Sequence, residues 1–164
     1  MDTETTTILL SVILLFFMLF CSALISGAEV ALFSLTKSQI DSFDNDNLKS
    51  TKTISKLLKS PKKLLATILV ANNFINIGVV ILFASLTEKI YGNHEIELIF
   101  YSYKLNIDVI FLIEVFVITF LILLFGEILP KIFANRNNLA FARFTAFIIF
   151  RLDKFLLFII TIPM

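Results

Sequence analysis

The sequence predicts an all-α integral membrane protein with three transmembrane helices and juxtamembrane amphipathic helices on the cytoplasmic side. The chain has 164 residues, of which 58% are hydrophobic, and its mean hydropathy is +0.93. Soluble domains average about 45–50% apolar residues, and a domain of this size keeps a large surface relative to its volume. Lipid is therefore the expected solvent for most of the chain.

Three apolar runs are long enough to cross a bilayer, at about residues 8–35, 64–90 and 109–135. A helix rises 1.5 Å per residue, so about 20 residues cross a hydrocarbon core of about 30 Å. Acidic residues and threonines, with no basic residue, precede the first run. Because a cleaved secretory peptide begins with a basic region, we expect the first run to be a permanent anchor.

Two further segments carry charges among their apolar residues, at about residues 36–60 and 139–164. The first spaces apolar residues among lysines, which is typical of short amphipathic helices at the lipid headgroups. A turn is expected at Asp44–Asn47, and Pro61 suits the first position of the second span. The second segment contains Arg143, and an arginine at the centre of a span costs about 2.5–3.5 kcal/mol. We therefore expect an interfacial or partly immersed helix there.

The distribution of basic residues predicts the orientation. The N-terminus has no lysine or arginine, and the loop between the second and third spans has only Lys89 and Lys104. Cytoplasmic loops are enriched in basic residues, so the N-terminus is expected outside and the C-terminus in the cytoplasm. The other twelve of the fourteen basic residues fall on the predicted inner side: Lys37, Lys49, Lys52, Lys56, Lys59, Lys62, Lys63, Lys131, Arg136, Arg143, Arg151 and Lys154.

Polar residues occur at similar depths in the three predicted spans. Ser26 and Asn72 each lie nine residues from the inner end of their span, and Glu127 lies eight residues from it. At the helical rise these separations are about 12–13 Å. Because three spans bring a hydroxyl, an amide and a carboxylate to one level, we expect a shared site on the cytoplasmic side of the midplane.

The spacing within each span supports this site. Ser22 lies four residues from Ser26, and Asn72 lies four residues from Asn76, so each pair shares a helix face. In the third span Pro130 has no N–H for the carbonyl four residues earlier, which in an α-helix belongs to Gly126. The candidate metal ligands are therefore Ser22, Ser26, Asn72, Asn76, Gly126 and Glu127.

An oxygen set with one carboxylate and no histidine or cysteine suits a hard cation such as Mg²⁺ or Ca²⁺. The alternative is that serine and asparagine only join helices through hydrogen bonds. Glu127 is the strongest candidate, because a carboxylate inside the membrane is costly and is functional by default. Glu29 is interpreted either as an attractor of cations at the inner mouth or as an interfacial carboxylate near lysines, and Asn73 as a packing residue on another face.

Composition argues against two classes of function. The net charge is +1, so nothing favours a nucleic-acid partner. The polar residues include no nucleophile paired with a base, so we expect no enzyme activity.

Three motifs resemble the CNNM/CorB/CorC family of membrane proteins. SGAEVALFSL at residues 26–35 resembles the first-helix signature of the family. PKKLLATILVANN at residues 61–73, followed by Asn76, resembles the start of its second helix. GEILPK at residues 126–131 resembles its third-helix signature. The motifs follow in the family's order and cover nearly the whole chain, and Ala71 departs from the glycine that is usual in the family.

The resemblance implies a homodimeric transmembrane domain, sometimes called domain of unknown function 21, that occupies residues 1–164 as one unit. It implies binding of Mg²⁺ near the membrane centre and its export, with coupling to Na⁺ entry. The composition, which is rich in Phe, Ile, Asn and Lys, indicates an AT-rich bacterial genome, so we expect a protein of the bacterial inner membrane. It also implies cytoplasmic CBS domains that bind ATP beyond residue 164. The leading hypothesis is a divalent-cation transporter. Its rival is an accessory protein of a gliding-motility or protein-secretion machine, as in the gliding-motility-associated branch of this family, with components of that machine as partners.

Overall fold

Three long helical segments form the body of the protein. The computed structural model describes residues 3–46, 48–91, 99–100, 103–104 and 109–161. Its helices that are long and apolar enough to cross a membrane are Thr5–Phe33, Pro61–Ile90 and Leu112–Arg136. They belong to α1 (Thr3–Phe33), to α4 (Pro61–Tyr91), and to a third span made of α5 (Val109–Leu121), η2 (Ile122–Ile128) and α6 (Leu129–Arg136). The all-α membrane fold with three spans is confirmed.

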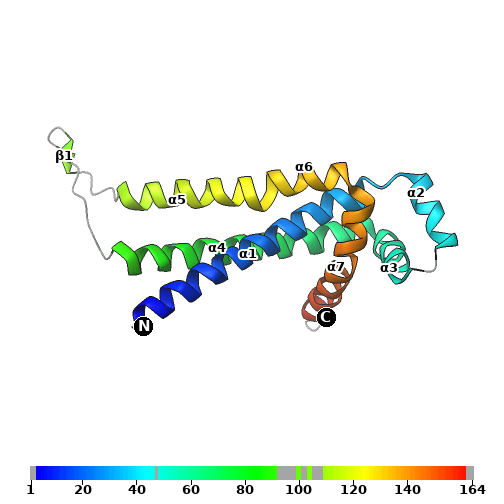
Figure 1. The fold of residues 1–164 in the computed structure, drawn as a ribbon, viewed down its shortest axis with the longest axis horizontal. Helices are drawn as coiled ribbons and strands as arrows, with labels where there is room; N and C mark the ends of the chain where they lie inside the picture. The colour runs from blue at the N-terminus through cyan, green and yellow to red at the C-terminus, as the bar shows by residue number, and fades with distance from the viewer. Residues whose placement is uncertain (1–2, 47, 92–98, 101–102, 105–108, 162–164) are drawn as a thin grey trace.

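The short elements gather at one end of this bundle, opposite the start of α1 (Figure 1). They are α2 (Lys37–Asp41), a 3₁₀ turn η1 (Ser42–Asn45) and α3 (Lys49–Leu58). Thr36 and Gln39 cap α2 reciprocally through side-chain and backbone contacts, which is the capping-box arrangement. Pro61 is the first residue of α4, where its missing N–H is tolerated.

The opposite end of the bundle carries a short hairpin. The strands β1 (Ile99–Phe100) and β2 (Tyr103–Lys104) pair antiparallel, with Ile99 opposite Lys104. The intervening loop residues lie outside the described part of the chain.

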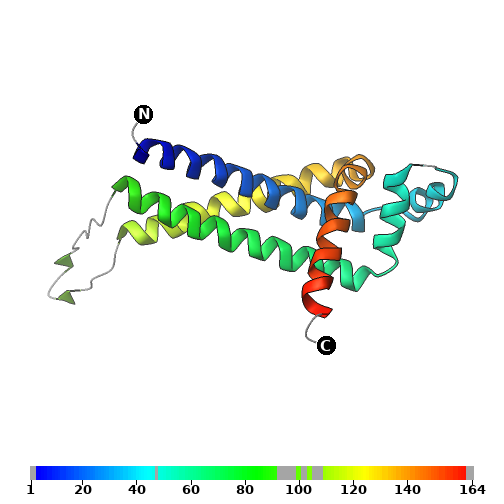
Figure 2. The ribbon, with the colours of Figure 1, turned by 90° about the horizontal axis from the view of Figure 1, so that it is seen from below.

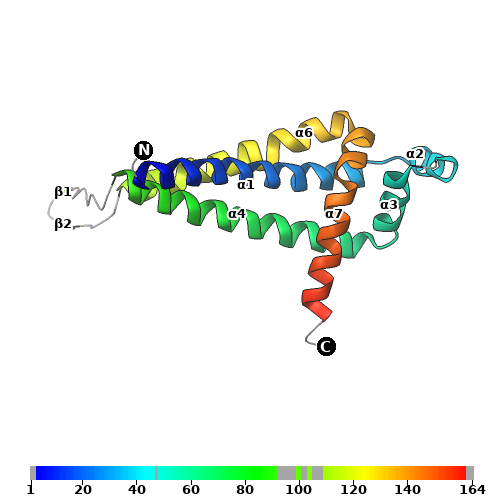
Figure 3. The same cartoon turned by 60° about the horizontal axis from the view of Figure 1, so that its bottom comes forward.

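The last helix, α7 (Asn138–Thr161), runs across the end of the bundle that carries α2 and α3 (Figures 2 and 3). This end is the one expected on the inner side of the membrane and is called the inner end. It is not among the three helices that qualify as spans in the described chain. The charges that interrupt this segment account for its placement, because Arg151 and Lys154 are exposed and Arg143 and Asp153 form ion pairs. The expected helix outside the spans is therefore present.

Two apolar clusters hold the helices together. The outer cluster joins the three spans through Leu15, Leu19, Val79, Ile118 and Ile122. The larger inner cluster joins the spans to α3 and α7, and its buried members are Ile25, Ala28, Ala31, Leu32, Phe43, Ile54, Leu57, Leu64, Ile68, Ala71, Ala134, Ala142, Ala146 and Ile149. Small residues are frequent in this cluster because they let helix backbones approach closely.

Two glycines in the spans serve contacts within this chain. A Cβ added at Gly27 would lie 2.6 Å from Cζ of Phe141, so this glycine makes room for the aromatic ring on α7. A Cβ at Gly78 would meet the terminal methyl of Met18. Small residues in spans can serve a dimer interface or the bundle itself, and in this structure both glycines make room for side chains of the same chain.

Three ion pairs brace the inner end. Lys63 Nζ lies 2.9 Å from Asp153 Oδ2 and joins α4 to α7. Arg143 donates to Asp46 Oδ2 at 2.8 Å and joins α7 to the segment between η1 and α3. The third pair, between Lys131 and Glu29 at 3.2 Å, joins α6 to α1. Partly exposed pairs contribute little each, but together they join α7 to α4 and to the segment before α3, and α6 to α1.

We predict that Gly27→Ala destabilises the protein more than Gly78→Ala does. Both changes improve helix propensity by roughly 1 kcal/mol, so the difference reports the local fit. Alanine at position 27 collides with the ring of Phe141, and overpacking typically costs about 1–3 kcal/mol. Met18 is flexible and can move aside.

Thermal unfolding in detergent measures both variants, and adding Phe141→Leu to Gly27→Ala should recover most of the loss. Equal melting temperatures for the two glycine variants would show that the contact between α1 and α7 is not tight.

Candidate functional site

A hydrogen-bonded network of polar side chains crosses the three spans. Ser22 on α1 donates to Oδ1 of Asn76 at 2.8 Å and lies 3.0 Å from Oδ1 of Asn72, both on α4. The amide nitrogens of Asn76 and Asn72 in turn donate to Oε1 of Glu127 at 3.2 and 3.4 Å. The network therefore joins α1 to α4 and α4 to η2, as expected from the spacing of these residues.

The hydroxyl of Ser22 is fully buried and carries one proton for two amide oxygens. It can satisfy only one of them fully at a time. Three oxygens (Oγ of Ser22 and Oδ1 of Asn72 and Asn76) are therefore packed together with one hydrogen between them. An arrangement that concentrates oxygen in this way favours a cation nearby, because lone pairs repel where no proton or cation separates them.

Ser26 lies one turn along α1 from Ser22 and is 1% exposed. Its hydroxyl has no hydrogen-bond partner, and among the buried side-chain atoms of the described residues only Nε of Arg143 is in the same condition. A buried polar group without a partner costs about 1–3 kcal/mol. An orphaned hydroxyl next to an oxygen-rich network fits a site that is completed by a ligand.

The level of the network on α1 differs from the one expected. The depth count placed Ser26 opposite Asn72, whereas Ser22 is the residue that contacts both asparagines. The count treated the spans as parallel, but α1 is inclined to α4 (Figure 1). The residue of α1 that meets Asn72 therefore lies one turn away from the residue at the same number of positions from the end of its span.

Glu127 lies in a π-helical segment, which the sequence analysis did not anticipate. In η2 the N–H of Leu129 bonds to the carbonyl of Leu124, five residues earlier. This bond shifts the hydrogen-bond register directly before Pro130, whereas the count that singled out the carbonyl of Gly126 assumed a regular α-helix. π-helical turns are rare and occur often at functional sites. In the sequence, the neighbouring Gly126 and Pro130 are the features that could have indicated this π-helical segment.

Gly126 contributes through its missing side chain. It is buried, and a Cβ at this position would lie 3.0 Å from Oγ of Ser22. The close approach of η2 to α1 at the network therefore depends on glycine. The backbone of Gly126 thus lies against the same hydroxyl that both asparagines contact.

The network forms a polar layer between the two apolar clusters. On every span its residues are flanked on one side by the outer cluster and on the other by the inner cluster. The flanking pairs are Leu19 and Ile25 around Ser22, Val79 and Ala71 around the asparagines, and Ile122 and Ala134 around Glu127. Movement of a hydrophilic solute across the bundle would require both clusters to open, one after the other.

Two residues near the site have roles that the sequence left open or assigned otherwise. Glu29 is held by Lys131 at 3.2 Å, which corresponds to the interfacial interpretation of this carboxylate. Asn73 is exposed and lines an open groove with Asn76 and Ile77 on the outside of α4. It does not pack inside the chain, in contrast to its interpretation as a packing residue.

The side chains of the site offer hydroxyl, carboxamide and carboxylate groups. In the described part of the chain, no group of three or more His, Cys, Asp or Glu side chains could hold a metal ion. A zinc site of the usual kind is therefore not formed by these residues. Hydroxyl, carboxamide and carboxylate oxygens are ligands of Mg²⁺ and Ca²⁺.

The fold and the site define a multi-spanning membrane protein with a polar layer inside its bundle. A family model described as the cyclin M transmembrane N-terminal domain (CNNM) matches residues 13–163, and the chain belongs to this family. The chain is 30% identical over 113 residues to the UPF0053 inner membrane protein YfjD of Escherichia coli strain K12, covering 69% of this chain and 23% of that protein.

A second relative is a UPF0053 protein of Haemophilus influenzae strain Rd. It is 30% identical over 142 residues, which cover 87% of this chain and 30% of that protein. UPF0053 proteins belong to the CNNM/CorB/CorC family, so the family resemblance of the three motifs is confirmed. The chain spans less than a third of the length of either relative.

We predict that Ser22→Ala destabilises the protein by about 1–3 kcal/mol, because both asparagine oxygens lose their buried donor. Ser11→Ala is the matched control, since Ser11 lies on the same helix, is half-buried and makes no side-chain hydrogen bond to any described residue. Thermal unfolding of the purified protein without added divalent ions measures both changes. Equal stability of the two variants would mean that the network does not hold the spans together.

Proposed function

We propose that this chain is the membrane domain of a divalent-cation transporter and that the polar layer binds the transported ion, with Mg²⁺ as the principal substrate. Membership of the CNNM family supports a divalent-cation transporter. The observation that carries the assignment to Mg²⁺ at this layer is the convergence of Ser22, Asn72, Asn76 and Glu127 beside the orphaned hydroxyl of Ser26.

Both asparagines can serve an empty and an occupied site. With their nitrogens they donate to Glu127, which keeps the carboxylate satisfied without an ion. Each carboxamide carries its oxygen opposite its nitrogen, so a half-turn about the terminal bond offers Oδ1 to a cation beside Glu127. The ion then replaces the amide hydrogens as the positive partner of the carboxylate. The backbone of Gly126 lies next to Glu127 in the chain and is a further candidate oxygen ligand.

The two apolar clusters on either side of the layer suit alternating access. An ion in the layer reaches water only when one cluster opens. If that cluster then closes and the other opens, the ion is released on the opposite side of the membrane. We propose export of Mg²⁺ coupled to Na⁺ entry, as the family resemblance implies. We propose a transport role for the layer and no enzymatic one.

We further propose a bacterial inner-membrane protein with the N-terminus outside and the C-terminus in the cytoplasm. The twelve basic residues lie on α2, on α3 and the turn after it, at the start of α4, on α6 and on α7, which belong to the end of the bundle away from the N-terminus. The cytoplasmic side carries such an excess. The relative from Escherichia coli is named as an inner membrane protein.

The working unit is proposed to be a homodimer, with CBS domains that bind ATP beyond residue 164. Within one chain, Asn73 exposes an amide on the lipid-facing side of a span. Such a group gains a hydrogen bond only if a neighbouring helix covers it. A second copy of the chain on this groove would provide that cover.

The central prediction is that Glu127→Gln removes most of the Mg²⁺-dependent rise in melting temperature. The amide keeps the shape of the carboxylate but lacks the charge that offsets dehydration of the ion. Asn72→Ala should weaken the effect less, and the exposed Asn73→Ala should leave it unchanged. The rise follows the ion concentration relative to the dissociation constant, so titration with Mg²⁺ measures affinity in each variant.

Ser26→Ala separates ion binding from helix cohesion. Because the hydroxyl has no partner, its removal should leave stability without Mg²⁺ unchanged or raise it. The same change should weaken the response to Mg²⁺ if the hydroxyl is a ligand. If every variant loses stability without Mg²⁺ and keeps the full Mg²⁺ response, the layer is structural and the assignment is wrong.

The orientation predicts opposite accessibility of two positions between the spans. A single cysteine at Ser50, at the start of α3, should react with an impermeant thiol reagent only after permeabilisation. One at His94, which lies outside the described residues, should react in intact cells. Both are placed in a Cys21→Ala background so that the native thiol is silent. Labelling in the reverse order would overturn the topology.

A further inference from the structure

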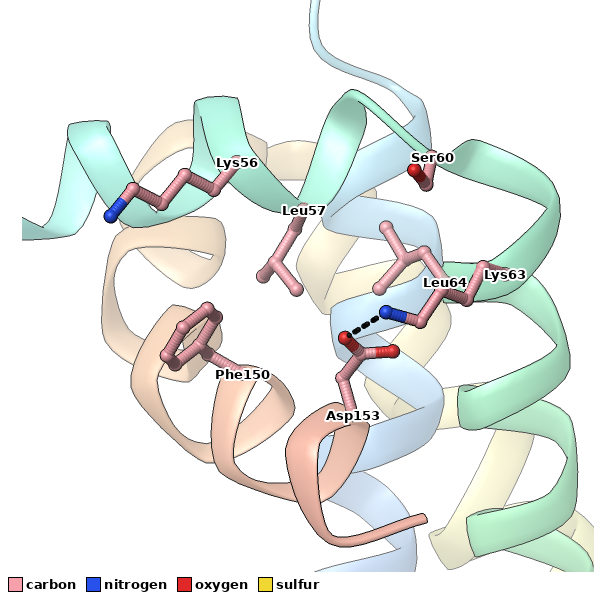
Figure 4. Close-up of a pocket in the computed structure, with 7 residues that line it drawn as sticks. All are labelled: Lys56, Leu57, Ser60, Lys63, Leu64, Phe150 and Asp153. Atoms are coloured by element: carbon pink, nitrogen blue, oxygen red, sulfur yellow. Dashed lines mark ion pairs between the residues drawn. The ribbon is translucent and has the colours of Figure 1, made fainter. Parts of the chain in front are cut away.

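A separate polar cavity lies at the inner end of the second span, where α3, α4 and α7 meet (Figure 4). Its volume is about 160 Å³. A water molecule occupies about 30 Å³ of the liquid, so the cavity has room for a group of several heavy atoms. The residues that line it are Lys56, Leu57, Ser60, Lys63, Leu64, Phe150 and Asp153.

The aspartate in this cavity is already satisfied. Its Oδ2 lies 2.9 Å from Nζ of Lys63, and its Oδ1 accepts a hydrogen bond from Thr67 at 2.9 Å. The Asp153 side chain is 14% exposed. Because both of its oxygens are engaged, this carboxylate does not provide a free ligand for a cation.

The unused groups around the cavity are donors. The ammonium group of Lys63 has three N–H donors, one of which faces Asp153, and its side chain is 40% exposed. Lys56 is exposed and forms no ion pair with any described residue. The hydroxyl of Ser60 is exposed as well. Two ammonium groups against one carboxylate leave a lining charge of +1, so the cavity favours an anion.

The side chains can converge on such an anion. Figure 4 shows Lys63 turned toward Asp153 and Lys56 extended along α3, away from that pair. The flexible four-carbon stem of lysine allows the ammonium of Lys56 to swing over the mouth. Phe150, Leu57 and Leu64 form an apolar wall beside the charged groups.

The place of the cavity selects the kind of anion. It lies at the first turn of α4, where the span begins at Pro61, which is the depth of the lipid headgroups. Leu65, next to the cavity residue Leu64, is 45% exposed, and Leu69 one turn further is 59% exposed. A ligand with a charged head in the cavity could therefore lay its apolar tail along the lipid-facing side of α4.

We propose that this cavity binds the phosphodiester headgroup of an anionic phospholipid, through Lys56, Lys63 and Ser60. The headgroup bridges α3, α4 and α7, and it adds to the Lys63–Asp153 pair in fixing α7 across the bundle. The site is independent of the polar layer and of the transport proposal. It differs from general attraction of a basic helix to an anionic membrane, because it assigns one lipid to one cavity.

The test uses the full chain in a neutral detergent, with native mass spectrometry to count bound lipid. Wild-type protein is titrated with phosphatidylglycerol, phosphatidylcholine and inorganic phosphate in separate arms. We expect one tightly retained phosphatidylglycerol per chain, and Lys56→Gln should weaken its binding about tenfold through loss of a charge-assisted hydrogen bond. Lys52→Gln, which removes the same charge from α3 outside the cavity, should weaken it less than about twofold.

Lys56 is exposed and unpaired among the described residues, so Lys56→Gln should fold normally, and its melting temperature without lipid checks this. The double variant Lys63→Gln with Asp153→Asn removes both charges of the pair together and should also lose the lipid. Equal losses for Lys56→Gln and Lys52→Gln would overturn the proposal in favour of diffuse attraction. Full displacement of the lipid by inorganic phosphate, or equal retention of phosphatidylcholine, would overturn the assignment to an anionic lipid.

Discussion

Lipid offers no hydrogen-bond partner to an amide, a hydroxyl or a carboxylate, so the polar groups in the middle of the spans must satisfy one another. Ser22, Asn72, Asn76 and Glu127 do this across three helices. The resulting contacts set the relative level of α1, α4 and η2, and the apolar clusters pack above and below that level. Where the helices cross, and which residues face the interior, follow from this one layer.

Close approach of the helices is the second requirement, and small residues provide it. Gly126 lets the hydroxyl of Ser22 reach the π-helical segment, and Gly27 accommodates the ring of Phe141. That ring also packs edge-on against Phe133, with centroids 6.3 Å apart. The transverse helix α7 is thus held against both α1 and α6. It is further tied by Arg143 to Asp46 and by Asp153 to Lys63.

The same polar layer serves cohesion and, in the proposed function, ion binding. An amide that donates to Glu127 in one state and turns its oxygen inward in another keeps the carboxylate satisfied in both. Ser26 is the exception, because its hydroxyl is buried without a partner and adds nothing to cohesion. Substitution of Ser26 can therefore separate an effect on ion binding from an effect on helix packing.

The sequence by itself determined the three spans, the separate character of the last helix and the polar residues of the layer, because span length, charge and helical spacing are local properties. The family also followed from three local motifs. Only the tertiary structure decided that Ser22 and not Ser26 meets the asparagines, since that depends on the inclination of α1 to α4. It also decided that η2 is π-helical, that Gly27 and Gly78 pack within the chain, and that Lys56, Lys63 and Phe150 surround one cavity. These features depend on contacts between residues far apart in the chain, and no spacing along a single helix encodes them.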